Sequence, residues 1–353
     1  MKRKIFARLR VWQAALILIL CGLLSLALRE PEKISRAGFS MNTLINMSVY
    51  ADDDKILDEA YGLLNKLDKE LSMYDLSSDI SKINFNAGVE SVKVPREVVE
   101  AVKDSLRLYD LTDGVFNPLI GAVTKLWKIN KADGVLPSPE SLDAAIKLSG
   151  IKNLEINNDE IFFKSKGCVL DLEGIAKGYA SYKIAELLKN RGVKSALIDL
   201  GGNVYVIGKK LEDNSNWNIG VRDPSSPYNS PALVLSVHDT SVITSGGYER
   251  FKTINGKKYT HFFDSKTGKS ITNDLLSVTI ITPDGSLADG LATAFMASGY
   301  EKSLEILKNI SNLNEIGVVF IKYDGSKIEI IATENLREKI SREKYKICYI
   351  IPK

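Results

Sequence analysis

Three short stretches of the chain carry side chains that could do chemistry on a charged ligand. In the first, residues 169–178 (VLDLEGIAKG), an expected strand leads through a tight turn into a strong helix. Free backbone N–H groups at such a helix start attract anions, phosphate in particular. Asp171 could bond a base or a ribose, Lys177 could reach a phosphate, and Gly174 would expose its carbonyl. Alone, the stretch also fits a capped core helix with a solvated lysine.

The second stretch, residues 288–293 (ADGLAT), places two oxygen ligands on one side of a helix. Asp289 and Thr293 stand four residues apart, so both face the same direction. Magnesium takes one or two carboxylates and completes its octahedron with waters, carbonyls and substrate phosphates. These two residues and one backbone carbonyl would therefore suffice for Mg²⁺. The alternative is an aspartate that favours the helix dipole and a buried threonine that bonds back to the helix.

The third stretch, residues 261–268 (HFFDSKTG), holds one of the chain's two histidines at the end of an expected strand. An imidazole with a pKa near neutrality suits a general base, although a lone histidine is more often structural. Residues 244–247 (TSGG) form a further candidate. Their hydroxyl and N–H groups could line a phosphate pocket, or they could form a plain turn.

The elements that must position these stretches alternate irregularly along the chain. Hydrophobic periodicity predicts helices at residues 55–71, 95–110, 139–148, 175–190, 287–297 and 301–310. It predicts strands at 41–50, 195–200, 203–207, 217–221, 232–237, 241–244, 258–263, 277–281, 316–322, 327–332 and 346–351. Residues 31–38 are expected to be a tether and residues 72–86 a polar loop. This order favours an α+β fold, with mixed sheets and packed helices, and one catalytic domain over residues 31–353.

Composition restricts the class of protein. The chain has 353 residues, 44% of them hydrophobic and 26% charged, which is ordinary for a globular protein. The net charge is +3, and no basic stripe on the body suggests a nucleic acid partner. The cysteines, Cys21, Cys168 and Cys348, form no CxxC pair, so a zinc site is not expected. A bridge between Cys168 and Cys348 stays open.

The N-terminus predicts contact with a membrane. Five basic residues among the first ten precede an apolar run over residues 11–28, which as a helix would span about 27 Å. Such a flank keeps the N-terminus in the cytoplasm. Residues 1–30 are interpreted as an uncleaved anchor; the alternatives are a signal peptide cut after residues 25–27 and a lipidated Cys21. Each interpretation places the chain from about residue 31 onward outside the cytoplasm, and the anchor holds it at the cell membrane on the extracytoplasmic side.

Taken in order, these stretches resemble the ApbE family of FAD:protein FMN transferases. The resemblance covers residues 40 to about 299 and includes Met41-Asn42-Thr43, where the family has Met-Gly-Thr. The other matching stretches are residues 72–84, 114–118, 126–127, 171–178, 201–202, 244–246, 261–268 and 288–293. Each one is weak alone, but the whole set in family order is a strong signal.

The resemblance implies a fold, a reaction and a role for individual residues. FMN would pass from the substrate FAD to a Thr or Ser hydroxyl of an acceptor protein, with Mg²⁺ bound and AMP released. The expected FAD contacts are Met41, Tyr74, Val115, Phe116, Asn117, Asp171, Lys177 and Phe263. The expected metal ligands are the carbonyl of Gly174, Asp289 and Thr293, and His261 would be the base. Two rival functions are hydrolysis of FAD to FMN and AMP, and flavin binding without turnover by a lipoprotein.

Overall fold

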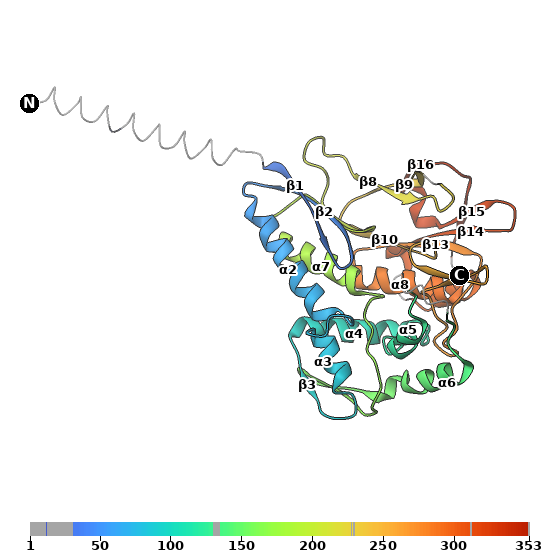
Figure 1. The fold of residues 1–353 in the computed structure, drawn as a ribbon. Coiled ribbons are helices and arrows are strands. Elements are labelled where there is room, and N and C mark those ends of the chain that lie inside the picture. Colours follow the sequence, from blue (N-terminus) through green and yellow to red (C-terminus); the bar gives the residue numbers. More distant parts are fainter. Residues whose placement is uncertain are drawn as a thin grey trace, which may run out of the picture.

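The computed structural model describes residues 12, 31–129, 135–226, 228, 230–310 and 313–351 (Figure 1). Except for Trp12, the expected anchor at residues 1–30 lies outside this part of the chain. Within the part described, no helix combines the length and the apolar character that crossing a bilayer requires.

A nine-stranded sheet forms the centre of the fold, in the order β1-β2-β6-β7-β10-β13-β14-β15-β17. Neighbouring strands are antiparallel except for β15 and β17, which are parallel. Its strands are β1 (Glu32–Ser40), β2 (Thr43–Ala51), β6 (Ala196–Leu200), β7 (Asn203–Ile207), β10 (Thr240–Gly246), β13 (Leu275–Thr282), β14 (Gly317–Tyr323), β15 (Ile328–Thr333) and β17 (Ile347–Ile350). Three smaller sheets combine β16 (Ile340–Glu343), β9 (Pro231–Val237) and β8 (Trp217–Arg222); β3 (Val92–Lys93), β5 (Glu160–Phe163) and β4 (Leu154–Asn157); and β11 (Phe251–Ile254) with β12 (Lys257–Thr260).

The helices cover one face of the large sheet and extend away from it. They are α2 (Lys55–Leu71), α3 (Asp79–Phe85), α4 (Arg96–Leu111), α5 (Gly121–Trp127), α6 (Pro139–Leu148), α7 (Ala176–Asn190), α8 (Gly285–Ser298) and α9 (Tyr300–Lys308). Figure 1 shows the β8–β9–β16 sheet on the other face, α7 and α8 beneath the large sheet, and α3 to α6 at the opposite end of the molecule. The expected α+β class, with mixed sheets and packed helices, is therefore confirmed.

Hydrophobic periodicity explains why the helices lie where they do. On α2 the apolar side chains recur at helical spacing, and Leu57, Ala60, Leu64, Leu67 and Leu71 are all buried. They belong to the main core between the large sheet and its helices. A second core lies between the large sheet and the β8–β9–β16 sheet. The three stretches with candidate site residues, 169–178, 261–268 and 288–293, lie at the edge of the main core, in or next to α7 and α8.

Two expectations about the first half of the chain are wrong. From Glu32 onward, the tether expected at residues 31–38 is part of β1, which pairs with β2 along its whole length. The two strands join through a two-residue turn in which Met41 and Asn42 have φ values of 49° and 58°, as a tight hairpin requires. The loop expected at 72–86 contains α3, whose first turn is capped by the Ser78 hydroxyl, which accepts from the N–H of Ser81 at 2.9 Å. Cys168 and Cys348 are both free.

Helices α7 and α8 touch backbone to backbone, because each has a glycine at the crossing. A Cβ added to Gly178 would overlap the carbonyl oxygen of Gly285 and lie 2.6 Å from the Cβ of Asp289. A Cβ added to Gly285 would in turn overlap the carbonyl oxygen of Gly178. The two glycines therefore set the distance between the start of α7 and the α8 residues that face it.

Substituting Gly178→Ala is expected to destabilise the protein. The new methyl group has no space, so the helices must separate, and overpacking of this kind costs about 1–3 kcal/mol. Urea unfolding followed by circular dichroism measures the loss. The matched control is Gly62→Ala on α2, where a Cβ meets open space. That change should stabilise the protein by about 0.5–1 kcal/mol, as alanine does inside an exposed helix. An equal change in the free energy of unfolding for both variants would contradict the conclusion that the α7–α8 crossing has no space for a Cβ.

Candidate functional site

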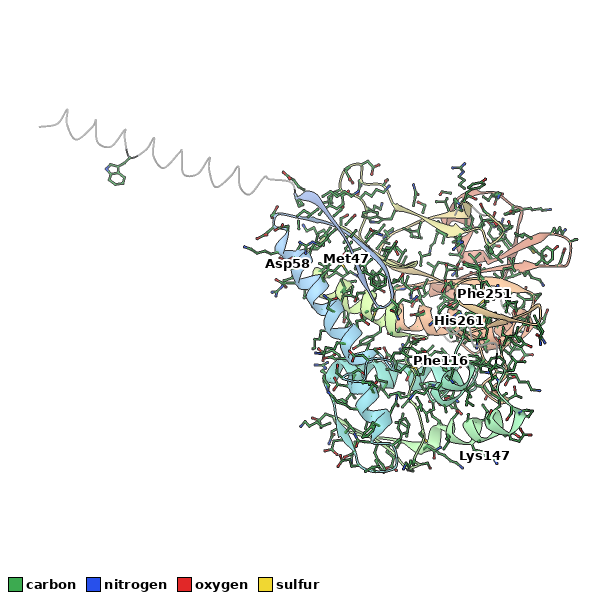
Figure 2. The ribbon with its side chains drawn as sticks, viewed as in Figure 1. Met47, Asp58, Phe116, Lys147, Phe251 and His261 are labelled. Carbon is green, nitrogen blue, oxygen red and sulfur yellow. The ribbon has the colours of Figure 1, made fainter. Side chains whose placement is uncertain are left out.

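A cavity of about 360 Å³ lies between the start of α7, the side of α8, the turn before α5 and the end of the β11–β12 hairpin. Almost all the residues singled out in the sequence line it: Tyr74, Val115, Phe116, Asn117, Asp171, Gly174, Lys177, His261, Phe263, Asp289 and Thr293. Figure 2 shows His261 and Phe116 in the middle of the molecule. Segments more than 200 residues apart in sequence, as Tyr74 and Asp289 are, thus meet at one place.

Met41 is the exception. It lies in the β1–β2 turn, where its N–H donates to Asp68 of α2 at 2.8 Å, and it is not among the residues that line the cavity. Its expected contact with FAD stays a prediction.

Three oxygen groups line the cavity where the Gly174 turn approaches α8. The Thr293 hydroxyl donates to the Gly174 carbonyl, with the oxygens 3.4 Å apart, and Asp289 lies one helical turn before Thr293. Glycine is required at 174, because a Cβ there would lie 2.9 Å from the ring of Phe116 and 3.3 Å from the Thr293 methyl. Carboxylate, hydroxyl and carbonyl oxygens are the hard donors that Mg²⁺ prefers, and its adjacent ligands stand about 3 Å apart. This donor set fits Mg²⁺.

The part of the chain described here has no second candidate metal site built from acidic, histidine or cysteine side chains. No three His, Cys, Asp or Glu side chains gather there closely enough to hold an ion. Asp289 is 4% exposed, and burial raises the pKa of its carboxyl group, opposed by the nearby charge of Lys177. The Gly178 N–H, Asn203 and the charges of Lys177 and Arg250 offset part of the cost of burying this carboxylate, and a bound cation would offset more.

The start of α7 differs from the expected phosphate cradle. The N–H groups of Ile175 and Ala176 donate to the Leu172 carbonyl at 3.0 and 2.9 Å, and that of Gly178 donates to Asp289 at 2.8 Å. The expectation of free N–H groups along this turn is therefore wrong, since the protein's own carbonyl and carboxylate occupy three of them. Lys177 lines the cavity and is the group of this turn that could attract a phosphate through its positive charge.

His261 is held in one tautomer. Its Nδ1 lies 3.0 Å from the carbonyl oxygen of Arg250, and because a carbonyl only accepts, Nδ1 carries the proton. The Nε2 lone pair is then free to take a proton. Burial, reinforced by the charges of Arg250 and Lys177, lowers the pKa of His261 to about 3. The imidazole is therefore neutral at physiological pH, which leaves Nε2 unprotonated, but so low a pKa also makes it a weaker proton acceptor than an ordinary histidine.

The wall opposite α8 is built from buried hydrogen bonds. Asp171 accepts from the Thr124 hydroxyl at 2.9 Å and from the N–H of Glu173 at 3.0 Å. Burial and the neighbouring Glu173 carboxylate raise the pKa of Asp171. Asn117 donates to the Ser149 carbonyl at 3.0 Å and accepts from the N–H of Leu119 at 2.9 Å. These bonds fix the turn before α5, so Asn117 holds the shape of the wall.

Aromatic rings complete the cavity. Phe263 stacks on Trp127 with the ring centres 5.8 Å apart, and Phe116 packs against the Gly174 turn. Tyr74 lines the opening and is half exposed. Flat apolar walls around a few polar groups are typical of sites that bind a ring-containing ligand.

The sequence profile of the ApbE family matches residues 41–320. The chain belongs to the ApbE family. A relative from Treponema pallidum, named FAD:protein FMN transferase, is 35% identical over 85% of this chain and 89% of its own length. A second, from Vibrio cholerae and named likewise, is 27% identical over 95% of this chain and 100% of its own. The expected family is thus confirmed, and with it the transferase class of enzyme.

Solved structures of ApbE proteins share the fold. The flavin transferase ApbE from Vibrio cholerae superposes with a TM-score of 0.77 at 26% identity, covering 88% of this chain and 99% of that one. The apo flavinyl transferase ApbE from Pseudomonas stutzeri gives 0.78 at 27% identity, covering 89% and 99%. The architecture described above is therefore that of the ApbE family over almost its whole length.

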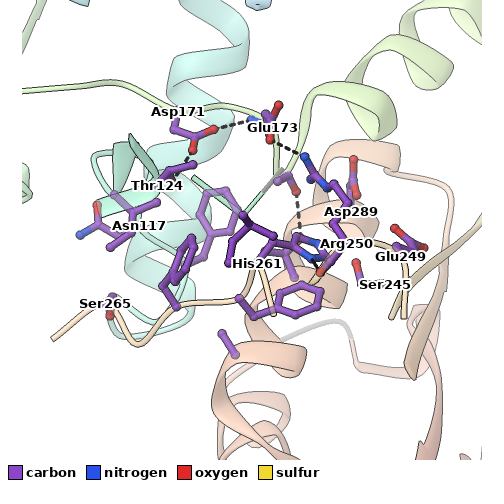
Figure 3. Close-up of a pocket in the computed structure, with 18 of the residues that line it drawn as sticks. Asn117, Thr124, Asp171, Glu173, Ser245, Glu249, Arg250, His261, Ser265 and Asp289 are labelled. Atoms are coloured by element: carbon purple, nitrogen blue, oxygen red, sulfur yellow. Dashed lines mark hydrogen bonds and ion pairs between the residues drawn. The ribbon is translucent and has the colours of Figure 1, made fainter. Parts of the chain in front are cut away.

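Several residues of this ApbE cavity were not singled out from the sequence. Arg250 and Glu173 form an ion pair of 2.9 Å within the lining, and Figure 3 shows the arginine reaching towards the glutamate. Glu249, Thr124 and Asn203 also line the cavity. Glu173 lies inside the stretch 169–178, but nothing in the spacing indicates a partner 77 residues away.

Proposed function

We propose that the protein is a Mg²⁺-dependent FAD:protein FMN transferase that moves FMN from FAD to a Thr or Ser hydroxyl of an acceptor protein and releases AMP. The observation that carries this proposal is the meeting of two groups in one cavity. A hard-oxygen donor set at Gly174, Asp289 and Thr293 faces the same space as a neutral histidine with a free Nε2. The names of the relatives supply the flavin substrate and the protein acceptor.

The reaction is a phosphoryl transfer in which one bond forms and one breaks. The acceptor hydroxyl oxygen attacks the phosphorus of the FMN half, and the bond from that phosphorus to the bridging pyrophosphate oxygen breaks. AMP leaves with the bridging oxygen, and the hydroxyl proton passes to Nε2 of His261. The product is a phosphoester between FMN and the acceptor.

The chain's own residues bind, orient and take up this proton. Lys177 supplies positive charge for the pyrophosphate, since it lines the cavity one turn beyond Gly174. Phe116, Phe263 and Tyr74 offer apolar faces for the ring system. The Arg250 carbonyl keeps the base in the tautomer that can accept a proton. When bound, Mg²⁺ supplies charge neutralisation on the phosphates.

The transfer assay tests the proposal against both rival functions. The full-length chain, purified in detergent, is incubated with FAD, MgCl₂ and a candidate acceptor protein. We expect the intact mass of the acceptor to rise by one FMN less one water, with one AMP released for each FMN attached. AMP release without the mass gain would indicate hydrolysis, and unchanged FAD would indicate binding alone. Either result would refute transfer to that acceptor.

We also propose that residues 1–30 hold the enzyme at the membrane with the catalytic body on the extracytoplasmic side. The basic flank and the apolar run support this orientation. Cys348 provides a probe, because it is exposed and free whereas Cys168 is buried. A membrane-impermeant maleimide should label Cys348 in intact spheroplasts, and the Cys348→Ser variant should remain unlabelled. Labelling that requires lysis would contradict the orientation.

A further inference from the structure

We infer that Arg250 is a positioning residue that holds the imidazole of His261 in place against the Gly174 turn. This inference rests on the proposed function, in which His261 accepts the proton of the acceptor hydroxyl. Arg250 makes two different connections, one through its backbone and one through its side chain, and together they join the base to the turn that offers the metal ligand.

The backbone connection lies at the open end of the β11–β12 hairpin. Phe251 pairs with Thr260 in this two-stranded sheet, so Arg250 and His261 follow as the next pair of residues. There the Nδ1–H of His261 donates to the Arg250 carbonyl at 3.0 Å. Each strand has four residues, and a two-stranded hairpin is at best marginally stable by itself. The position of the imidazole therefore depends on what fixes the hairpin to the body of the enzyme.

One side of the hairpin is fixed by Trp127 of α5. The ring of Trp127 contacts that of Tyr259 with centres 5.4 Å apart, and its backbone carbonyl accepts from Lys252 at 3.3 Å. These contacts hold the hairpin to the wall formed by α5. Residues 270–271 also hold the His261 strand, since the Thr260 hydroxyl donates to the Ile271 carbonyl at 2.9 Å and the Ile271 N–H donates to the Phe262 carbonyl at 2.8 Å. None of these contacts involves the turn at the start of α7, so the distance between the base and the proposed metal ligands depends on a second attachment.

The side chain of Arg250 supplies that second attachment. Its Nη1 lies 2.9 Å from Oε2 of Glu173, and the two side chains are 39% and 30% exposed. Glu173 immediately precedes Gly174, whose carbonyl is a proposed metal ligand. Figure 3 shows Arg250 extending from the His261 side of the cavity to Glu173. The guanidinium thus fixes the hairpin end to the turn at the start of α7.

Precise placement of the base matters for rate more than for binding. A displacement of about 1 Å in a reacting group costs on the order of 10²-fold in turnover. Loss of the Arg250–Glu173 ion pair should therefore lower kcat by about 10- to 100-fold. If the ion pair acts only by positioning His261, FAD affinity should change by less than about threefold, although both side chains line the cavity, because each bonds to the other.

A double-mutant cycle on the full-length enzyme tests this. The variants are Arg250→Gln, Glu173→Gln and the double substitution, with Arg250→Lys as a milder change that retains the charge. The control is Arg107→Gln, which breaks a similar ion pair with Asp284 outside the cavity. For each variant, kcat is measured by acceptor labelling at saturating FAD, the Kd for FAD by equilibrium dialysis, and folding by thermal denaturation.

We expect each single glutamine variant to lose kcat, the double variant to be no worse than either single one, and Arg250→Lys to recover part of the loss. Arg107→Gln should keep kcat even if it lowers Tm. Losses that multiply in the double variant, or a raised Kd with unchanged kcat, would show that Arg250 acts directly on a substrate and would overturn the inference. Absence of transfer by the wild-type enzyme would instead refute the proposed function.

Discussion

Substituting Asp289→Ala is expected to abolish FMN transfer. Asp289 is the only anionic side chain among the three proposed metal ligands, and it is buried beside the cavity. Without it, a hydroxyl and a carbonyl remain, and two neutral oxygens hold a divalent cation poorly. Metal stabilisation of phosphoryl transfer is worth several kcal/mol, so turnover should fall on the order of 10³-fold or more. Acceptor labelling in saturating MgCl₂ measures the effect.

The control for this experiment lies on the same helix. Asp284 caps the first turn of α8, accepting from the N–H of Leu287 at 2.9 Å, and it does not line the cavity. Asp284→Ala should cost about 1 kcal/mol of stability through loss of the cap and leave the transfer rate close to wild type. Wild-type rates for Asp289→Ala would rule out the metal assignment, and a matching loss in both variants would point to damage of α8.

The second large effect is expected at His261. Removing a general base typically costs 10²–10⁴-fold in rate, so His261→Ala should slow transfer by about that factor. FAD should still bind, because the oxygen donors, Lys177 and the aromatic walls remain. Single-turnover labelling gives the rate, and equilibrium dialysis with FAD and Mg²⁺ gives the affinity.

The other histidine serves as the matched control. His238 is exposed and pairs with Asp239 at 3.1 Å, away from the cavity. His238→Ala should therefore transfer FMN at the wild-type rate. An unchanged rate in His261→Ala would exclude it from the chemistry, while loss of FAD binding in that variant would assign it to the ligand site instead.

The sequence predicted best the elements that bury a continuous apolar face. The helix expected at 175–190 is α7 (Ala176–Asn190), and that expected at 287–297 is α8 (Gly285–Ser298). The edge strand β1 was not predicted, because its alternation of exposed and half-buried residues contains charges and resembles a tether. α3 was missed for a related reason, since only Ile80 and Ile83 of this short helix are buried.

The site was predictable where a motif is local and not where a contact is long-range. The spacing of Asp289 and Thr293 predicts that both face one side of a helix, and both line the cavity, where the Thr293 hydroxyl contacts the Gly174 carbonyl. Their role as metal ligands stays a prediction. The Arg250–Glu173 pair depends on how a hairpin and a turn from different parts of the chain approach each other. The expectation of free N–H groups at the start of α7 was wrong for the same reason, that the contact is long-range. The sequence alone did not show that Asp289 would face Gly178.

The glycine contact between α7 and α8 bears on which ions the enzyme can use. The two helices meet through backbone atoms at Gly178 and Gly285, so they cannot move closer together at that crossing, which lies one turn from Gly174. Oxygen ligands stand about 2.0–2.1 Å from Mg²⁺ and about 2.3–2.6 Å from Ca²⁺, so a larger ion must push its ligands apart. If the proposed site binds Mg²⁺, we expect this fixed helix spacing to disfavour the larger ion, because Asp289 and Thr293 lie on one of the two helices that cross there.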